Sequence, residues 1–285
     1  MISKTKFQHE IDLIIANAIR EDVGDGDHSS MACIPITAKG KAKLLVKDEG
    51  IIAGVEFAKK VFRYVDRNLK VETLIQDGSK VKYGDIVFYV EGSSQSILKT
   101  ERLVLNAMQR MSAIATKTKL FAELIEGTKA KIIDTRKTTP GIRALEKWAV
   151  QIGGGENHRF GLYDMIMLKD NHIDFAGGIT KAIEKTKRYL SETKRNLKIV
   201  VEARNLDEVK EILQNDGIYR ILIDNFNFED TKKAVKLIND NCLTESSGGI
   251  SEKTIRDYAL CGVDYISSGA LTHSVYNLDL SLKAV

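Results

Sequence analysis

The chain has 285 residues, enough for one large α/β domain or for a medium-sized domain with a smaller partner. Hydrophobic residues make up 43% and charged residues 29%, which is ordinary for a globular protein with a sizeable core. The net charge of +4 is too small for a protein that coats a polyanion, so we expect no nucleic-acid partner.

Cysteine usage and the N-terminus predict a cytoplasmic protein. Cys33, Cys242 and Cys261 are far apart, odd in number and outside any CxxC motif, which is typical of buried thiols in a reducing compartment. The first apolar stretch, LIIANAI, is short and is followed by acidic residues, which indicates an amphipathic helix and not a signal peptide. No apolar run approaches the ~18 residues of a membrane span, so we expect no membrane partner.

The first part of the chain has the pattern of an α+β domain. Apolar residues at helical spacing predict a helix over 8–21, which ends in the loop EDVGDGDHSS. Strand-like runs follow at 41–55 and 71–94, and the turn signals Asp77-Gly78 and Tyr83-Gly84-Asp85 predict a small antiparallel sheet. A long helix is expected over about 96–126.

After Gly127 short strands alternate with helices. The expected strands are 131–134, 165–168, 198–202, 220–224, 241–245 and 264–267. The helical patterns include 205–215, where Asn205 and Glu208 fit a capping box with Asn as the cap, and 227–239. Glu202, Asp224, Ser246 and Ser268 follow one another at intervals of 22 residues, each at or just past a strand end. Equal repeats favour a barrel over an open doubly wound sheet.

Polar groups gather where these strands end. Because active sites of α/β barrels lie at the carboxyl ends of the strands, these groups are candidates for one site. In chain order they are Thr135, Arg136, Lys137, His158, Arg159, Lys169, Glu202, Asp224, Ser246, Ser247, Gly248, Gly249, Ser268 and Gly269. Ser-Gly turns present backbone N–H groups to phosphate, arginine suits carboxylates, and isolated acids can hold ribose hydroxyls or Mg²⁺. The pattern predicts a ligand with phosphate and carboxylate groups.

Each of these features also has a purely structural interpretation. An isolated Ser-Gly-Gly is usually only a turn, a lone lysine after a strand is usually solvated, and a lone acid often caps a helix. His172 and His273, near strand ends, are equally compatible with structural and functional roles. The glycine run 153–155 just before His158 is interpreted as allowing the backbone to approach a substrate.

Long ordered motifs resemble the quinolinate phosphoribosyltransferase family, also known as nicotinate-nucleotide pyrophosphorylase (carboxylating). They are EDVGDGD, TERLVLNAMQRMSAIATKT, DTRKTTPGIRALEKWAV, GGGENHRFGLYDMIMLKDNHI, ILIDNF, ESSGGI and GVDYISSGALTHSV. Ala113, Trp148, Ala203 and the His28-Ser29 pair depart from the usual residues. None of these departures removes a charged group, so they bear on substrate fit and leave the expected reaction intact.

The resemblance implies a type II phosphoribosyltransferase-like fold. It consists of an N-terminal α/β sandwich over 1–115, to which residues 271–285 return, and an incomplete, open α/β barrel over 116–270. It also implies a homodimer in which Arg102 of one subunit reaches the other subunit's site.

The implied reaction joins quinolinate to phosphoribosyl pyrophosphate with Mg²⁺ and releases pyrophosphate and CO₂. The catalytic residues would be Lys137, Lys169, Glu202 and Asp224, with Glu202 and Asp224 also serving a Mg²⁺ ion held mainly by substrate phosphates. The substrates would be bound by Arg102, Thr135, Arg136, Lys137, His158, Arg159, Lys169, Glu202, Asp224, Ser247, Gly248, Gly249, Ser268, Gly269 and His273.

Three alternatives stay open at this point. A relative associated with molybdate transport shares the TRKT and GGG-x-x-HR features, although the full NHRFGLYD and LKDNH strings favour the quinolinate enzyme. A Schiff-base aldolase would use Lys169, but a lysine among carboxylates stays charged and is a poor nucleophile. The third alternative is an anion-binding protein without catalytic activity.

Overall fold

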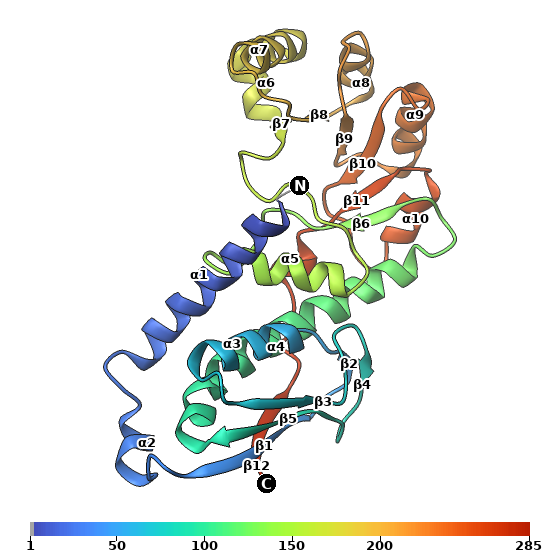
Figure 1. Cartoon of the computed structure of the whole chain (residues 1–285). Helices are drawn as coiled ribbons and strands as arrows, with labels where there is room; N and C mark the ends of the chain where they lie inside the picture. The colour runs from blue at the N-terminus through green and yellow to red at the C-terminus, as the bar shows by residue number, and fades with distance from the viewer. Residues whose placement is uncertain (1–2) are drawn as a thin grey trace. The chain divides into compact units, whose positions relative to one another are not determined.

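The structure, a computed structural model, describes residues 3–285 (Figure 1). The chain forms two compact units. The first unit contains residues 3–119, 138–154 and 271–285, and the second contains 120–137 and 155–270.

The first unit is built on an antiparallel sheet of four strands in the order β12-β1-β5-β3. These strands are β1 (Lys39–Val46), β3 (Lys70–Thr73), β5 (Ile86–Ser93) and β12 (Leu280–Ala284). A separate pair joins β2 (Gly50–Ile51) to β4 (Lys80–Val81). In β1 the side chains of Ala42, Leu44 and Val46 are buried in alternation with more exposed neighbours, as expected for a sheet with one face on a core. The predicted antiparallel sheet is confirmed.

Helices complete the first unit. They are α1 (Lys4–Val23), α2 (His28–Cys33), α3 (Val55–Val65), α4 (Ser94–Leu124), α5 (Arg143–Ile152) and the short α11 (Ala270–His273), with the end of α4 and the start of α11 belonging to the second unit. The helices predicted over 8–21 and 96–126 are confirmed as α1 and α4. Helix α3 was not predicted, because its apolar residues follow directly on a strand-like, glycine-broken run. Its buried residues nevertheless recur at helical spacing.

Two segments distant in sequence belong to this first unit. Strand β12 pairs with β1 in the register Ala42↔Ala284, which brings the end of the chain back to the sheet. Residues 138–154 also belong here, although they lie within the range 116–270 that was expected to form the barrel. The reason is packing of α5, where the Trp148 ring makes an edge contact with Phe7 of α1 at 6.1 Å between centroids.

Gly153 has a structural role that differs from the predicted one. A Cβ atom at this position would lie 2.4 Å from the carbonyl oxygen of Ala115 and 2.7 Å from the Cβ of Thr118, both in α4. Glycine therefore allows the end of α5 to approach α4 closely, which explains this residue without a substrate.

The second unit is a parallel sheet of six strands in the order β6-β11-β10-β9-β8-β7. Its strands are β6 (Lys131–Ile133), β7 (Ile166–Leu168), β8 (Ile199–Ala203), β9 (Arg220–Asp224), β10 (Leu243–Ser247) and β11 (Tyr265–Ser267). From β7 to β11 every strand is added on the same side of its predecessor, which is the winding of a barrel. The order ends at β6 and β7, so the sheet is open, and the expected incomplete α/β barrel is confirmed.

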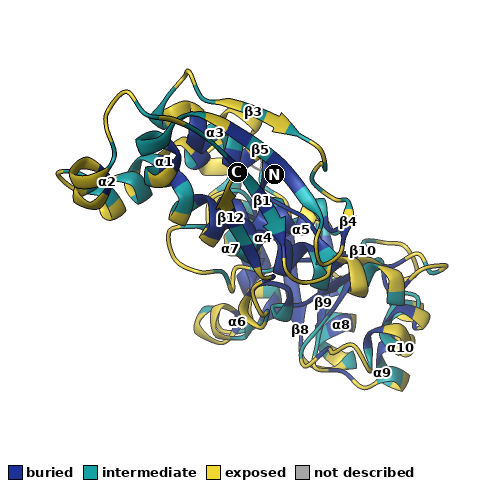
Figure 2. Cartoon of the chain, turned by 90° about the horizontal axis from the view of Figure 1, so that it is seen from below, coloured by how far each residue is buried: buried dark blue, intermediate teal, exposed yellow. Residues whose placement is uncertain are grey.

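Helices α6 (Asp170–Ala176), α7 (Ile179–Glu192), α8 (Leu206–Leu213), α9 (Phe228–Ile238) and α10 (Ile255–Leu260) connect these strands. Figure 2 shows exposed residues on α6, α9 and α10, whereas strand β8 is buried throughout. The cap predicted at Asn205 is confirmed, since its side chain accepts from the N–H groups of Asp207 and Glu208. A capping box also predicts that the Glu208 side chain accepts from the backbone N–H of Asn205. This prediction is wrong, because Glu208 accepts from the N–H of Arg204 and also binds the Arg204 guanidinium.

Among residues 3–285, no helix is both long enough and apolar enough to cross a membrane.

Candidate functional site

The carboxyl ends of the parallel strands bring most of the predicted side chains to one edge of the second unit. Strand β6 leads into Thr135–Lys137, β7 into Lys169, and β10 into Gly248. Two backbone hydrogen bonds join neighbouring strand ends. Ser268 N–H donates to the carbonyl of Ile133 at 3.1 Å, and Asn225 N–H donates to that of Ser247 at 2.9 Å. These bonds tie the end of β11 to β6 and the end of β9 to β10.

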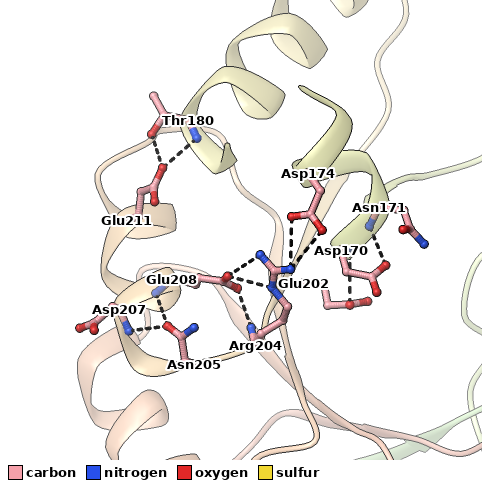
Figure 3. Close-up of polar contacts among 10 residues, drawn as sticks. All are labelled: Asp170, Asn171, Asp174, Thr180, Glu202, Arg204, Asn205, Asp207, Glu208 and Glu211. Atoms are coloured by element: carbon pink, nitrogen blue, oxygen red, sulfur yellow. Dashed lines mark hydrogen bonds and ion pairs between the residues drawn. The ribbon is translucent and has the colours of Figure 1, made fainter. Parts of the chain in front are cut away.

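Carboxylates and a lysine meet on β7, β8 and β9 (Figure 3 shows Glu202 beside Asp170). Glu202 is only 6% exposed, and burial together with the charge of Asp224 raises the pKa of its carboxyl group. Its Oε1 accepts from the N–H of Asp170 at 3.4 Å, and its Oε2 lies 3.8 Å from Lys169 Nζ. These contacts favour the ionised form of Glu202, but they offset the effect of its burial only in part.

Two arginines form the basic side of this edge. Arg159 is 8% exposed, and burial together with the positive charge of Arg136 lowers the pKa of its guanidinium, while Asp164 opposes that shift. The guanidinium donates to the carbonyl of Met165 at 3.3 Å, which fixes its orientation. Arg136 is exposed at the end of β6. Two guanidinium groups held this close are well suited to bind a ligand with several negative charges.

His158 lies beside these arginines with its ring turned into the unit. Its Nδ1 accepts from the N–H of Arg159 at 2.6 Å, and its Nε2 lies 3.2 Å from a carboxylate oxygen of Glu245. The N–H of His158 donates to Asp134 at 2.8 Å. Because the side chain is 4% exposed, its ring contacts lie mainly within the protein.

The predicted phosphate loop after β10 contains a glycine that its surroundings require. Gly248 has φ of +94°, and a Cβ there would lie 2.1 Å from the side-chain oxygen of Asn225. Asn225 itself has φ of +57°, and its Nδ2 donates to Asp224 at 2.6 Å. The Asn225 amide therefore fills the space above Gly248 and orients the Asp224 carboxylate.

The other predicted residues fall into two groups. The first group lies at strand ends. Thr135 follows β6 and accepts from the N–H of Lys137 at 3.0 Å, Gly249 follows β10, and the Ser268–Gly269 turn follows β11. Arg102 and His273 are exposed residues of the first unit, and His273 Nδ1 lies 2.6 Å from the hydroxyl oxygen of Ser274.

Several residues of this region were not identified from the sequence. Asn225 follows a predicted site acid directly, and that adjacency was an available signal. Arg220, by contrast, begins the apolar strand RILID, and Glu245 lies in the mostly polar strand LTESS, whose polar residues gave no sign that this one is buried. A charged residue in a buried strand is nevertheless unusual.

The acids at this edge suit a cation bound mainly by its ligand. Residues 3–285 contain no group of three or more His, Cys, Asp or Glu side chains placed to hold a metal ion. The negative charge of Asp224 nevertheless disfavours the ionised form of Glu202 and raises its pKa. A bound cation would reduce this repulsion. Mg²⁺ commonly takes one or two protein carboxylates and completes its shell with phosphate oxygens and water.

Family models match nearly the whole chain. The quinolinate phosphoribosyl transferase N-terminal domain matches residues 27–112, and the C-terminal domain of the same name matches residues 114–283.

Individual proteins give the same result. A protein of Oryza sativa subsp. japonica named nicotinate-nucleotide pyrophosphorylase (carboxylating), chloroplastic, is 45% identical over 96% of this chain and 78% of its own length. A Bacillus subtilis protein named probable nicotinate-nucleotide pyrophosphorylase (carboxylating) is 39% identical over 92% of this chain and 89% of its own. The crystal structure of NadC from Streptococcus pyogenes matches with a TM-score of 0.90 and 37% identity over 100% of both chains.

Proposed function

This chain belongs to the quinolinate phosphoribosyl transferase family, and we propose that it transfers phosphoribose from phosphoribosyl pyrophosphate to quinolinate. The products are nicotinate mononucleotide, pyrophosphate and CO₂, a step of de novo NAD biosynthesis. The observation that carries this proposal within the structure is the buried Arg159 next to Arg136, facing the same strand-end edge as Glu202 and Asp224.

Quinolinate has two adjacent carboxylates, which match the basic side of the edge. Arg136 and Arg159 bind them through paired N–H donors, and Lys169 adds a point charge. Arg102 completes this set from the neighbouring subunit of a homodimer. His158 supports the same group of residues, and His273 is a further substrate-binding residue of this proposal.

Phosphoribosyl pyrophosphate occupies the rest of the edge. The turns Ser247–Gly249 and Ser268–Gly269 hold the 5′-phosphate with backbone N–H groups. Thr135 and Lys137 bind the diphosphate, and the Glu202 and Asp224 carboxylates hold the ribose hydroxyls. Glu202 and Asp224 would hold Mg²⁺ together with phosphate oxygens of the substrate, and the ion would supply positive charge that neutralises the leaving group.

The chemistry needs positioning more than proton transfer. The ring nitrogen of quinolinate attacks the anomeric carbon with its lone pair, while the bond to pyrophosphate breaks and the leaving group keeps the electron pair. Glu202 and Asp224 stabilise the positive charge that develops on the ribose. As CO₂ leaves, the electron pair of the C–CO₂ bond stays with the quaternised ring. A proton then adds to the ring carbon that carried the carboxylate.

The ion pair between Lys169 and Glu202 supports this role for Lys169 over that of an aldolase nucleophile, because a charged amine cannot attack a carbonyl. We place the enzyme in the cytoplasm because its cysteines are free thiols. The expectation that all three are buried is wrong, since Cys33 is exposed and Cys242 is half-buried, and only Cys261 is buried.

The test is one assay with quinolinate, phosphoribosyl pyrophosphate and Mg²⁺, in which nicotinate mononucleotide and CO₂ are followed together. Both products should appear in equal amounts. Arg159→Ala should raise the KM for quinolinate about a hundredfold, since a buried carboxylate contact is lost. Arg256→Ala, an exposed arginine that binds backbone carbonyls at Leu124 and Glu126, is the matched control and should leave both KM values unchanged. A folded protein that forms neither product would refute the proposal.

A further inference from the structure

A cluster of charged side chains lies buried inside the second unit, within the strands that carry the site. It joins Glu245 in the middle of β10, Arg220 at the start of β9, and His158 in the segment before β7. Glu245 Oε2 lies 2.7 Å from the Arg220 guanidinium and 3.2 Å from His158 Nε2. The three side chains are 1%, 6% and 4% exposed. Such a group costs more desolvation free energy than an apolar core of the same volume, so its presence calls for a function.

The cluster has a defined protonation pattern. Nδ1 of His158 accepts from a backbone N–H, so it carries no proton. The ring proton is therefore on Nε2, where it faces the Glu245 carboxylate. Burial alone would raise the pKa of Glu245, but hydrogen bonds from His158 and Ser267 and the charge of Arg220 hold it at about 2. The carboxylate is thus ionised and fixed, and the Arg220 guanidinium is held in turn over the Tyr265 ring at 4.0 Å.

His158 connects this cluster to both arginines of the site. Through Nδ1 it holds the backbone of Arg159. Through its own N–H it binds Asp134, a fully buried residue two positions before Arg136. Neither Glu245 nor Arg220 has a part in the proposed reaction, yet Glu245 contacts His158, which binds the backbone of Arg159, and Arg220 contacts Glu245.

We infer that Glu245 and Arg220 are positioning residues for carboxylate binding, and that they act by locking His158 in one ring orientation. This inference rests on the proposed function, which assigns quinolinate to Arg136 and Arg159. The two guanidinium groups repel each other before the ligand binds, so a rigid support is needed to keep them in place. Preorganised groups bind a ligand more tightly because less ordering remains to be done on binding.

The test separates positioning from a general loss of stability. In Glu245→Met with Arg220→Met, both charges are removed together, so no unpaired charge stays buried. We expect this folded double variant to raise the KM for quinolinate about tenfold, while the KM for phosphoribosyl pyrophosphate changes less than about twofold. Glu245→Gln keeps an acceptor oxygen for His158 Nε2–H and should give a smaller increase in the same KM.

Asp77→Ala is the matched control in the other unit. Asp77 is a half-buried residue whose side chain accepts from the N–H groups of Val55 and Glu56 at the start of α3, so removing both acceptor oxygens lowers stability away from the cluster. This variant should leave the KM for quinolinate unchanged. An unchanged KM in the folded Glu245→Met, Arg220→Met variant, or a parallel rise in both KM values, would overturn the inference.

A second readout does not depend on turnover. Nitrogen NMR of the wild-type His158 ring should show a protonated Nε2 and an unprotonated Nδ1, and the double variant should show a mixture of the two tautomers. The same spectrum in both proteins would show that Glu245 does not fix the ring. Absence of turnover in the wild type would refute the proposed function separately, with the ring spectrum still deciding whether the cluster orients His158.

Discussion

Among single residues, Glu202 occupies an environment that does not suit its charge. Burial and the neighbouring Asp224 raise its pKa, so the folded protein binds a proton at this carboxyl more tightly than the unfolded chain does. The free energy of unfolding therefore increases, through this group, as the pH falls from neutral through the folded pKa, and the gain is complete below the unfolded pKa. Functional sites commonly keep such destabilising groups.

Glu202→Gln should accordingly stabilise the protein while abolishing turnover. At pH 7 we expect the free energy of unfolding to rise by about 1 kcal/mol, because the neutral amide avoids the charge repulsion. Near pH 4 the difference should shrink, since the wild-type carboxyl becomes protonated. Urea denaturation at the two pH values measures both effects.

Asp207→Asn is the control for this prediction. The hydrogen bond and charge of Lys210 lower the pKa of the exposed Asp207, so its removal should bring no gain at pH 7. If the Glu202→Gln protein were less stable than wild type at pH 7, the ionised Glu202 carboxylate would not be destabilising in the folded state.

Among the elements, the local patterns predicted the strands and the strand ends well. The six parallel strands were located from short runs, and the largest displacement is that of β10, by two residues from the expected 241–245, while β8 is displaced by one residue from 198–202. Periodicity is a local property of the chain, so a single sequence is enough to show it. Helix α3 was missed where two local patterns overlapped.

What the sequence could not provide is the set of contacts between distant positions. His158, Arg220 and Glu245 lie in three separate segments, and their burial depends on the folded sheet. For the same reason the glycine run was interpreted as making room for a substrate, although Gly153 makes room for the backbone of α4. A residue's identity shows what it can do, but only the packing shows what it contacts.

The packing of α5 on α4 gives a prediction at this scale. Gly153→Ala would place a Cβ against the Ala115 carbonyl, and backbone cannot move aside as a flexible side chain can. We expect the free energy of unfolding to fall by about 2 kcal/mol through overpacking. Gly154→Ala is the control: its φ of +91° costs about 1 kcal/mol, but no atom lies within 4 Å of the new Cβ. Chemical denaturation of both variants should rank them in that order, and equal losses would mean that close helix packing is not the reason for Gly153.

For the whole molecule, the central question is whether one chain holds a complete site. Arg102 belongs to the first unit and Arg136 to the second, and the proposed homodimer takes them from different subunits. In a twofold dimer the same surfaces of both subunits meet, so each of the two sites would contain one subunit's Arg102 and the other subunit's Arg136.

Mixing two inactive variants tests this arrangement directly. Arg102→Ala and Arg136→Ala should each be inactive alone. After subunit exchange in an equal mixture, half of the dimers are hybrids, and in each hybrid one site carries both defects while the other is intact. Activity should therefore recover to about one quarter of the wild-type value. Arg136→Ala mixed with Arg159→Ala is the control, because both residues come from the same unit and every hybrid site lacks one of them. Recovery in the control would contradict the placement of Arg136 and Arg159 in one site. No recovery in the first mixture, despite exchange shown by mass spectrometry, would place Arg102 in its own subunit's site or outside it.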